Sequence, residues 1–460
     1  MKTFTFEKRS ALPVDRQAAF AWHDRPGAFE RLTPPFEPVT LVEHTGGIRD
    51  GARVVIRIKN GPIAIHWHAH HEGYDPPSMF VDVQEKGPFA YWRHEHRFEA
   101  GDAGHAVMHD HVTFAPPLGP LGRLGLPVIR KKLERMFAYR HDTLAHDLAD
   151  HARFADQGPR TFVVTGASGL VGTQLCAFLS TGGHKVRRMV RTNADTGAGR
   201  YLWDPLTGDF DPSALDGADA VIHLAGESVF ALRWSASKKR SILESRERGT
   251  RTVADAIRAH GGVSTLISAS AVGYYGDVPQ GDVDERAPKG EGFLADVCEA
   301  WEAPARELNR DGVRVVTARI GVVLSPAGGA LATMRTPFAL GLGGPIGSGR
   351  QGFPWVSIDD TVRALHWCAM RSDLSGPVNL VAPETITQRA FASALGRVLR
   401  RPAVLPAPAP MLKLLAGELA REVFLKGAAV VPRTLLDSGF VFRDDRASSA
   451  LARLLGRASR

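Results

Sequence analysis

The sequence predicts a doubly wound α/β fold for the larger, C-terminal part of the chain and an α+β fold for the part before it. From residue 161 to about residue 384, apolar runs alternate with helical periods, which is typical of a parallel sheet covered by helices on both faces. Before residue 155, strand after strand is followed by a single long helix. At 460 residues the chain is long enough for two or three packed domains.

The first predicted domain, residues 1–154, is built mainly of strands that alternate polar and apolar residues. An edge strand in "TFTFEKRSAL" is followed by a helix after Pro13. Further strands are expected in "ARVVIRIK", "IAIHWHAHHE", "SMFVDVQE", "FAYWRHEHRF" and "HAVMHDHVTF". A long helix over residues 126–154 ends the domain, and its apolar face consists of Ile129, Leu133, Phe137, Leu144 and Leu148.

A polar linker, "ADQGPR" at residues 155–160, separates this domain from the next. The second domain, residues 161–384, has strands in "TFVVTG", "KVRRMVR", "ADAVIHLAG", "STLISAS" and "VRVVTARIGVVL", with helices between them. Residues 385–460 are helical with a Pro-rich break and are expected to form a small cap.

Composition and charge exclude several classes of protein. The formal charge is +8, but the sequence has no run of five or six basic residues, so we expect no nucleic-acid partner. No stretch of eighteen apolar residues and no signal peptide are present, which predicts a cytoplasmic protein without a membrane partner. Cys176, Cys298 and Cys368 lie far apart, so neither a disulfide framework nor a zinc ribbon is supported.

A glycine-rich turn follows the first strand of the second domain. In "TFVVTGASGLVG", Gly166, Gly169 and Gly172 give GxxGxxG directly after an apolar strand and at the start of a helix. Glycines permit the tight turn and let the backbone approach a pyrophosphate, whose charge the helix N-terminus stabilises. The predicted cofactor-binding residues are Gly166, Ala167, Ser168, Gly169, Leu170, Val171 and Gly172, with Leu224, Ala225 and Gly226 after a later strand.

The residue after the second strand of this domain favours NADP over NAD. An acid at this place would bind the ribose 2′-hydroxyl of NAD, whereas an arginine accommodates the 2′-phosphate of NADP. The strand ends "RRMVRTNAD", with Arg191 in that place. NAD stays possible because Asp195 follows closely.

Taken together, these phrases resemble a known family. GxxGxxG, "HLAGES", "SASAVGYYG" and "ARIGVVLS" resemble the extended short-chain dehydrogenases, the nucleoside-diphosphate-sugar epimerase/dehydratase group. More narrowly, "GFLADVCEAWE", "GLGGPIGSGRQGFPWVSIDD" and "RTLLDSGFVF" resemble an atypical, uncharacterised epimerase-like branch with a C-terminal domain of unknown function. The resemblance implies a Rossmann-type sheet for residues 161–384. In the first domain, "GPFAYWRHEHRF" resembles the START-like (SRPBCC, cyclase/dehydrase) proteins, which implies a helix-grip fold around an apolar ligand.

The resemblance also implies a catalytic machinery, and part of it is missing. In the wider family a strand-end serine or threonine holds the substrate oxygen, and Ser270 matches that role. The family's Tyr-x-x-x-Lys pair is absent, because none of the six tyrosines has a lysine four residues on. On the helix "GFLADVCEAWE", Phe293 and Val297 take the places of that pair, and neither can transfer a proton.

Other residues are candidates for the missing proton donor and for substrate contact. Tyr274 and Tyr275 follow Ser270 closely, and Cys298 and Glu302 would titrate nearer neutrality if burial shifted them. For each of these, a packing or pocket-lining role is the alternative. The substrate-binding candidates, by resemblance to related epimerases, are Arg319, Arg350, Gln351 and Trp355.

Histidines in HxH patterns lie on three predicted strands of the first domain: His66, His68, His70, His94, His96, His109 and His111. Alternation along the strands predicts that only His94 and His96 point inward. Because the set does not converge, we expect no metal site, and we interpret His94 and His96 as polar groups that line an apolar ligand cavity.

Three functions fit the sequence. The first is an NADP-dependent oxidoreductase or epimerase-like enzyme acting on a small carbonyl or carbinol substrate. The second is a catalytically silent NADPH-binding sensor or scaffold, as the missing pair suggests. In the third, the first domain does the work and the second is a relic. Substrate, reaction direction and oligomeric state stay open.

Overall fold

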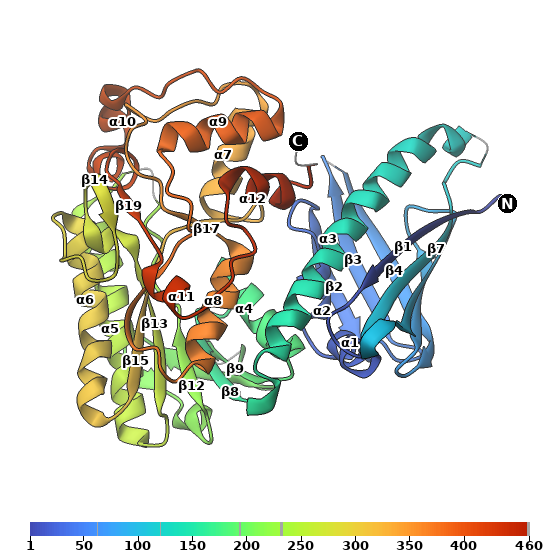
Figure 1. Cartoon of the computed structure of the whole chain (residues 1–460), viewed down its shortest axis with the longest axis horizontal. Helices are drawn as coiled ribbons and strands as arrows, with labels where there is room; N and C mark the ends of the chain where they lie inside the picture. Colours follow the sequence, from blue (N-terminus) through green and yellow to red (C-terminus); the bar gives the residue numbers. More distant parts are fainter. Residues whose placement is uncertain (62, 120, 193–194, 231–232, 458–460) are drawn as a thin grey trace. The chain divides into compact units, whose positions relative to one another are not determined.

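The computed structural model describes the chain except for residues 62, 120, 193–194, 231–232 and 458–460. The chain divides into two compact units (Figure 1). Among the described residues, the first unit consists of residues 1–159 with 177–183 and 455–457, and the second consists of residues 160–176 and 184–454. None of the helices in the described part of the chain is long and apolar enough to cross a membrane.

The first unit is an antiparallel sheet with one long helix. The sheet has seven strands in the order β1-β7-β6-β5-β4-β3-β2. The strands are β1 (Phe4–Ala11), β2 (Val39–Thr45), β3 (Arg53–Asn60), β4 (Ile63–Asp75), β5 (Met79–Lys86), β6 (Tyr91–Ala100) and β7 (Ala106–Ala115), and the helices are α1 (Arg16–Asp24), α2 (Ala28–Leu32) and α3 (Leu126–Ala152). Sequence analysis predicted all of these except β2 and α2.

Strand alternation decides which side chains of this sheet face the core. On β6, Trp92, His94, His96 and Phe98 are all buried, while the residues between them are half-buried. This confirms the predicted inward orientation of the two histidines. Helix α3 contributes Leu133, Phe137, Leu144 and Leu148 to the apolar clusters that these strands form.

The second unit contains the predicted parallel sheet, in the order β11-β10-β9-β8-β12-β13-β15-β18. Its strands are β8 (Thr161–Thr165), β9 (Lys185–Val190), β10 (Arg200–Asp204), β11 (Asp209–Phe210), β12 (Ala220–His223), β13 (Thr265–Ala271), β15 (Arg314–Ile320) and β18 (Gly376–Leu380). Only β11 pairs antiparallel. The principal helices are α4 (Leu170–Thr181), α5 (Ala236–His260), α6 (Phe293–Glu307), α7 (Gly329–Ala339) and α8 (Ile358–Met370). Helices α5 and α6 lie on one side of the sheet and α8 on the other (Figure 1).

The strand order creates a switch point at β8. From β8 the chain moves outward through β9 and β10, and then returns to place β12 on the other side of β8. In such sheets the ligand lies in the crevice beyond the carboxyl ends of the two strands at the switch. The loops after β8 and β12 are therefore the walls of the expected crevice.

The C-terminal residues belong to the second unit. They form α9 (Gln388–Leu399), α10 (Ala409–Ala416), α11 (Arg433–Asp437), α12 (Ala447–Leu454) and the short strand β19 (Ala428–Val430). Strand β19 pairs with β14 (Val278–Val283), which follows β13. This pairing joins the predicted cap to the segment that follows "SASAVGYYG". A separate pair of short strands, β16 (Val322–Leu324) and β17 (Trp355–Ser357), follows β15.

Candidate functional site

The glycine-rich turn lies between β8 and α4, where the sequence predicted it. Gly166 has φ of +67°, which is the left-handed region that favours glycine. A Cβ on Gly166 would lie 2.9 Å from the backbone nitrogen of Ala225 and 2.9 Å from the carbonyl carbon of Leu224. The loop after β12 thus packs directly against the turn, and no side chain separates them.

The other two glycines have different surroundings. A Cβ on Gly172 would lie 2.1 Å from the carbonyl oxygen of Gly166, so only glycine lets α4 start this close to the strand. A Cβ on Gly169 would meet one protein atom within 4 Å, the Gly166 oxygen at 3.2 Å. Of the three glycines, Gly169 is the one with room above it, which is where a pyrophosphate approaches a dinucleotide-binding turn.

The ends of β8 and β12 are tied together by Thr165. Its hydroxyl lies 2.7 Å from Nδ1 of His223 and accepts hydrogen bonds from the backbone N–H groups of Leu224 and Ala225 at 3.2 and 3.4 Å. Burial lowers the pKa of His223 to about 3, so this imidazole is neutral at neutral pH. The hydrogen bonds from Leu224 and Ala225 to Thr165 therefore involve no charged side chain.

Arg191 lies directly after β9 and is exposed. Val164 of β8 pairs with Arg188 of β9 in parallel register, so Arg191 lies at the same edge of the sheet as the glycine turn. Asp195 is bonded to the Thr192 hydroxyl. Between Thr192 and Asp195, residues 193–194 of the quoted segment "RRMVRTNAD" lie outside the described residues.

Three strand residues form a row across the sheet next to this crevice. Ser270 on β13 pairs with Arg319 on β15, which pairs with Asn379 on β18. Glu302 of α6 faces the row and accepts a hydrogen bond of 2.7 Å from the Ser270 hydroxyl. Arg319 donates to both oxygens of Glu302, at 2.8 and 3.0 Å, and all of these groups are buried. The structure thus brings Ser270 and Arg319 together through Glu302, which accepts hydrogen bonds from both. Because these polar groups bond one another, they leave little surface for a ligand.

The two adjacent tyrosines have different environments. Tyr275 is 1% exposed, donates to Asn379 Oδ1 at 2.7 Å and accepts from Arg319 at 3.0 Å. Burial raises the pKa of Tyr275 to about 12, against the effect of Arg319. Tyr274 is half-buried, and the guanidinium of Arg319 lies 3.5 Å above its ring. Of the two tyrosines, Tyr274 is the less buried, and its ring packs against the apolar cluster that contains Tyr275 and Val283.

Cys298 does not fit the predicted proton-transfer role. Its thiol is 3% exposed and contacts the carbonyl of Ala271 at 3.5 Å. Burial, followed by the nearby Glu302 carboxylate, raises the pKa of Cys298 to about 11. We expected burial to bring this group toward neutrality. The shift goes the other way because burial disfavours the thiolate.

Two of the predicted substrate contacts have structural partners instead. Trp355 is completely buried in β17, so it offers no stacking surface to a substrate. The side-chain amide of Gln351 donates to the carbonyls of Ile346 and Phe424, at 3.1 and 2.7 Å, and thereby holds the loop. Arg319 is committed to Glu302. Only Arg350 is exposed.

The helix that should carry the missing pair also differs from expectation. Phe293 packs edge-on against Trp234 rather than at the strand end. Glu302 is the α6 residue that bonds Ser270. The sequence named Glu302 only as a weak candidate and did not single out Asn379. The available signal for Glu302 was its helical spacing from Cys298. Asn379 gave none, because its place depends on the pairing of β18 with β15.

Comparisons with known proteins identify the family of the chain. Residues 162–380 match the model of the NAD dependent epimerase/dehydratase family, and residues 407–454 match a domain of unknown function, DUF1731. Epimerase family protein Mb2239 of Mycobacterium bovis is 44% identical over 288 residues, which are 63% of this chain and 95% of that protein. The human epimerase family protein SDR39U1, whose structure was solved with NADPH, is 35% identical over 64% of this chain and 99% of its own, with a TM-score of 0.60.

One solved structure extends over both units. The nucleoside-diphosphate sugar epimerase from Corynebacterium glutamicum covers 98% of this chain and 90% of its own, at 33% identity and a TM-score of 0.80. The parallel sheet, the glycine turn at its switch point and these matches lead to one conclusion. The chain belongs to the NAD dependent epimerase/dehydratase family.

Proposed function

We propose that this protein binds NADP(H) at the β8–β12 crevice and uses it as an oxidoreductase or epimerase-like enzyme on a small carbonyl or carbinol substrate. The observation that carries the proposal is the open space above Gly169. On either side of it the backbone is in close contact: Gly166 packs against Leu224 and Ala225, and Gly172 packs against the carbonyl oxygen of Gly166. A solved human relative with NADPH supports the choice of nucleotide. When bound, the nicotinamide would supply or accept a hydride.

Each wall of the crevice has a role in nucleotide binding. The backbone from Gly166 to Gly172 lies against the pyrophosphate at the N-terminus of α4, and Leu224 to Gly226 form the opposite wall. Arg191 binds the 2′-phosphate, because a guanidinium is the side chain best suited to a phosphate. The bonding of Asp195 to Thr192 supports NADP over NAD, since that acid already has a partner.

Tyr274 is the proposed group that touches the substrate. It is half-buried, whereas Ser270, Tyr275 and Cys298 are buried and already bonded. Ser270 and Tyr275 then act as positioning residues through Glu302 and Arg319, and Arg350 is the exposed cation available to a substrate.

A catalytically silent NADPH-binding sensor is the second candidate, and one observation favours it. Burial places the pKa values of Tyr275 and Cys298 at about 12 and about 11, far from the neutral range in which a general acid works well. If Tyr274 also fails, the one candidate left among those predicted from the sequence is Glu302, whose carboxylate already accepts from Ser270 and Arg319.

For the first unit we propose the START-like helix-grip fold, with an apolar small molecule as its ligand. An antiparallel seven-stranded sheet packed against the single long helix α3 supports the fold. A cytoplasmic location is the proposed setting for both units.

Nucleotide titration tests the cofactor site. NADPH should bind to the purified chain more tightly than NADH, followed by quenching of protein fluorescence. Gly169→Ala should weaken both nucleotides by at least about 10-fold without loss of stability, because the added methyl occupies the pyrophosphate space. Arg191→Gln should weaken NADPH alone by about 10- to 100-fold, the loss of a charge-assisted hydrogen bond. Arg200→Gln, an exposed arginine on neighbouring β10, is the matched control.

Turnover distinguishes the enzyme from the sensor. Oxidation of NADPH is followed with a panel of aldehydes, ketones and nucleotide sugars. The enzyme proposal expects at least one compound to accelerate oxidation and Tyr274→Phe to slow it about 100-fold with unchanged NADPH affinity. If NADPH is oxidised at the same slow rate with every compound, in the wild-type chain and in Tyr274→Phe alike, the protein is a sensor. Equal binding of NADPH and NADH with no effect of Arg191→Gln would overturn the cofactor assignment.

A further inference from the structure

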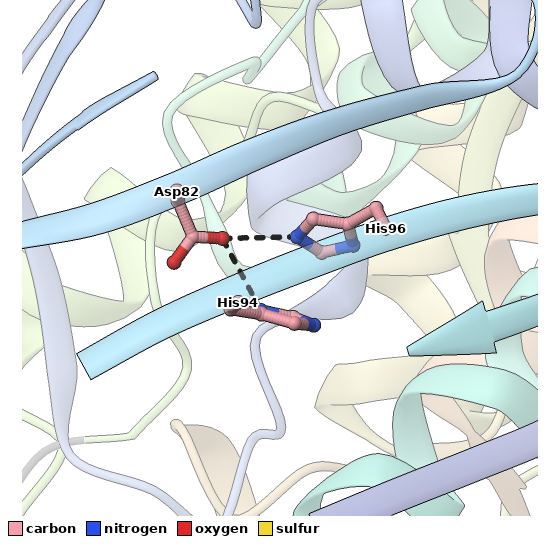
Figure 2. A group of neighbouring side chains, drawn as sticks. All are labelled: Asp82, His94 and His96. Carbon is pink, nitrogen blue, oxygen red and sulfur yellow. Dashed lines mark hydrogen bonds and ion pairs between the residues drawn. The ribbon is translucent and has the colours of Figure 1, made fainter. Parts of the chain in front are cut away.

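The interior of the first unit holds a compact group of imidazoles and carboxylates. Asp82 of β5 lies opposite His94 of β6 in the antiparallel register, with Phe80 opposite His96. One ligand atom each of Asp82, His94 and His96 lies within 4.8 Å of the other two (Figure 2). Oδ1 of Asp82 lies 3.2 Å from Nδ1 of His94 and 2.9 Å from Nε2 of His96.

A second carboxylate supports the same two imidazoles from their other edges. Oδ1 of Asp110, on β7, lies 2.9 Å from Nε2 of His94 and 2.9 Å from Nδ1 of His96. His141 of α3 holds the other oxygen of Asp110 at 2.7 Å, and Ser10 lies 2.9 Å from the remaining nitrogen of His141. Metal-bound histidines are normally supported in this way, with a carboxylate on the ring nitrogen away from the metal.

We propose that Asp82, His94 and His96 bind a divalent transition-metal ion, with Asp110 and His141 as its supporting residues. Two imidazoles and one carboxylate are a donor set that suits zinc, iron, nickel or copper. Metal–ligand bonds of about 2.0–2.2 Å place neighbouring ligand atoms about 3.3 Å apart in a tetrahedral site. The two distances from Asp82 are close to that separation, and the two imidazole nitrogens lie within 4.8 Å of each other.

The group is buried but open on one side. His94 and His96 are 2% and 3% exposed, and Nδ1 of His96, the nitrogen on the side of Asp110, makes an ion-pair contact that lacks hydrogen-bond geometry. Asp82 keeps 23% of its side chain exposed, so an ion can reach the group from that side. Its second oxygen accepts a bond of 3.3 Å from the indole of Trp92, which fixes the carboxylate. The remaining coordination positions would be open to water or a substrate.

The sequence pointed away from this site because the three strands with HxH patterns do not converge. Only His94 and His96 of that set belong to the group, and the other members are Asp82, Asp110 and His141. No cysteine precedes residue 176, so thiolates play no part. The site lies in the first unit, and its success or failure is independent of the nucleotide proposal.

Metal titration of the full chain, made without a histidine tag and treated with EDTA, tests the site. We expect one Zn²⁺ per chain with a Kd below about 1 μM, measured by competition with a chromophoric chelator. Co²⁺ should give visible absorption bands of a nitrogen- and oxygen-coordinated ion, a readout independent of any activity. Asp82→Asn and His96→Gln should each weaken Zn²⁺ binding by at least about 100-fold, and Asp110→Asn by about 10- to 100-fold.

His66→Gln is the matched control, because His66 is an exposed histidine on β4 of the same sheet and should leave binding unchanged. Circular dichroism checks that each variant is folded. If His96→Gln does not fold, the comparison of Asp82→Asn with the wild-type chain tests the proposal. No stoichiometric binding to the wild-type chain, or equal binding to Asp82→Asn, would overturn the proposal and identify the group as a charge network only.

Discussion

The two units each bury a network of charged side chains, and the networks are balanced differently. In the first unit, two carboxylates, Asp82 and Asp110, share the imidazoles of His94 and His96. In the second unit a single carboxylate, Glu302, faces a single buried guanidinium, Arg319, through two hydrogen bonds. Shared partners give redundancy, whereas the second network depends on one pair.

The same contrast explains two histidines that are equally buried. Burial opposes the charged form of His94, yet Asp82 and Asp110 raise its pKa to about 9. His223 has a hydroxyl partner and no carboxylate, and burial lowers its pKa to about 3. Neighbouring charge, and not burial alone, decides which state an interior histidine adopts.

The largest effect should follow from Glu302→Gln. The change leaves Arg319 buried without a carboxylate, and the loss of one partner of a buried ion pair costs about 3–5 kcal/mol. Peptide-resolved hydrogen exchange should show faster exchange in β13 and β15 with the first unit unaffected. Glu307→Gln, which removes an exposed ion pair with Arg251, should cost below about 1 kcal/mol. Equal effects of the two changes would contradict the single-pair description.

Acid should weaken the second unit through His223. The pKa of His223 is lowered in the folded state, so as pH falls the unfolded chain takes up a proton before the folded chain does. The contribution of the neutral imidazole to the free energy of unfolding is therefore complete above pH 6.5 and decreases as pH falls below it. At pH 5 the loss from this group is about 2 kcal/mol, from about 1.4 kcal/mol per pH unit below an unfolded pKa of about 6.5. Urea unfolding between pH 7 and pH 5 measures it. His223→Asn should flatten that slope, and an unchanged slope would contradict the assignment.

Tyr275→Phe should have a smaller effect. It removes a hydroxyl that donates to Asn379 and accepts from Arg319, which costs about 1–2 kcal/mol for two buried hydrogen bonds. Thermal unfolding and exchange in β18 check it. Tyr274→Phe is the matched control, since its ring contacts Arg319 and the change keeps the ring. A greater loss with the control would show that the network is anchored at the other tyrosine.

Asp82→Asn should cost the least, about 1 kcal/mol in the presence of EDTA. Asp110 still faces both imidazoles, and the one oxygen of an asparagine still accepts from His96, as Asp82 does in Figure 2, while the 3.3 Å bond from Trp92 is lost. Hydrogen exchange in β5 and β6 measures the loss. A cost comparable to that of Glu302→Gln would show that the first network has no redundancy.

Much of the fold could be predicted because the strongest signals are local. The alternation on β6 and the GxxGxxG turn after β8 need no knowledge of pairing. Strands β10, β11 and β18 were missed, because "RYLWD", "DF" and "GPVNL" contain at most one β-branched residue each, unlike "TFVVT" of β8. Their place is set by the neighbouring strands.

The sites could be predicted only in part, because they depend on register. Asp82 meets His94 since β5 and β6 pair in one register, and a slip of one residue would turn Asp82 to the opposite face. The same holds for Arg319, whose position between Ser270 and Asn379 follows from the pairing of three strands. The sequence indicates which residue types can bind or react. It does not indicate which strands pair, and that pairing decides which of these residues meet.

The backbone contact at Gly166 joins the loop after β8 and the loop after β12 into one rigid unit. With no side chain between the turn after β8 and the loop at Leu224 and Ala225, there is no clearance for one loop to shift past the other. A redesign of nucleotide preference therefore has its freedom at Gly169 and Arg191. At Gly166, any larger residue changes both sides of the crevice at once.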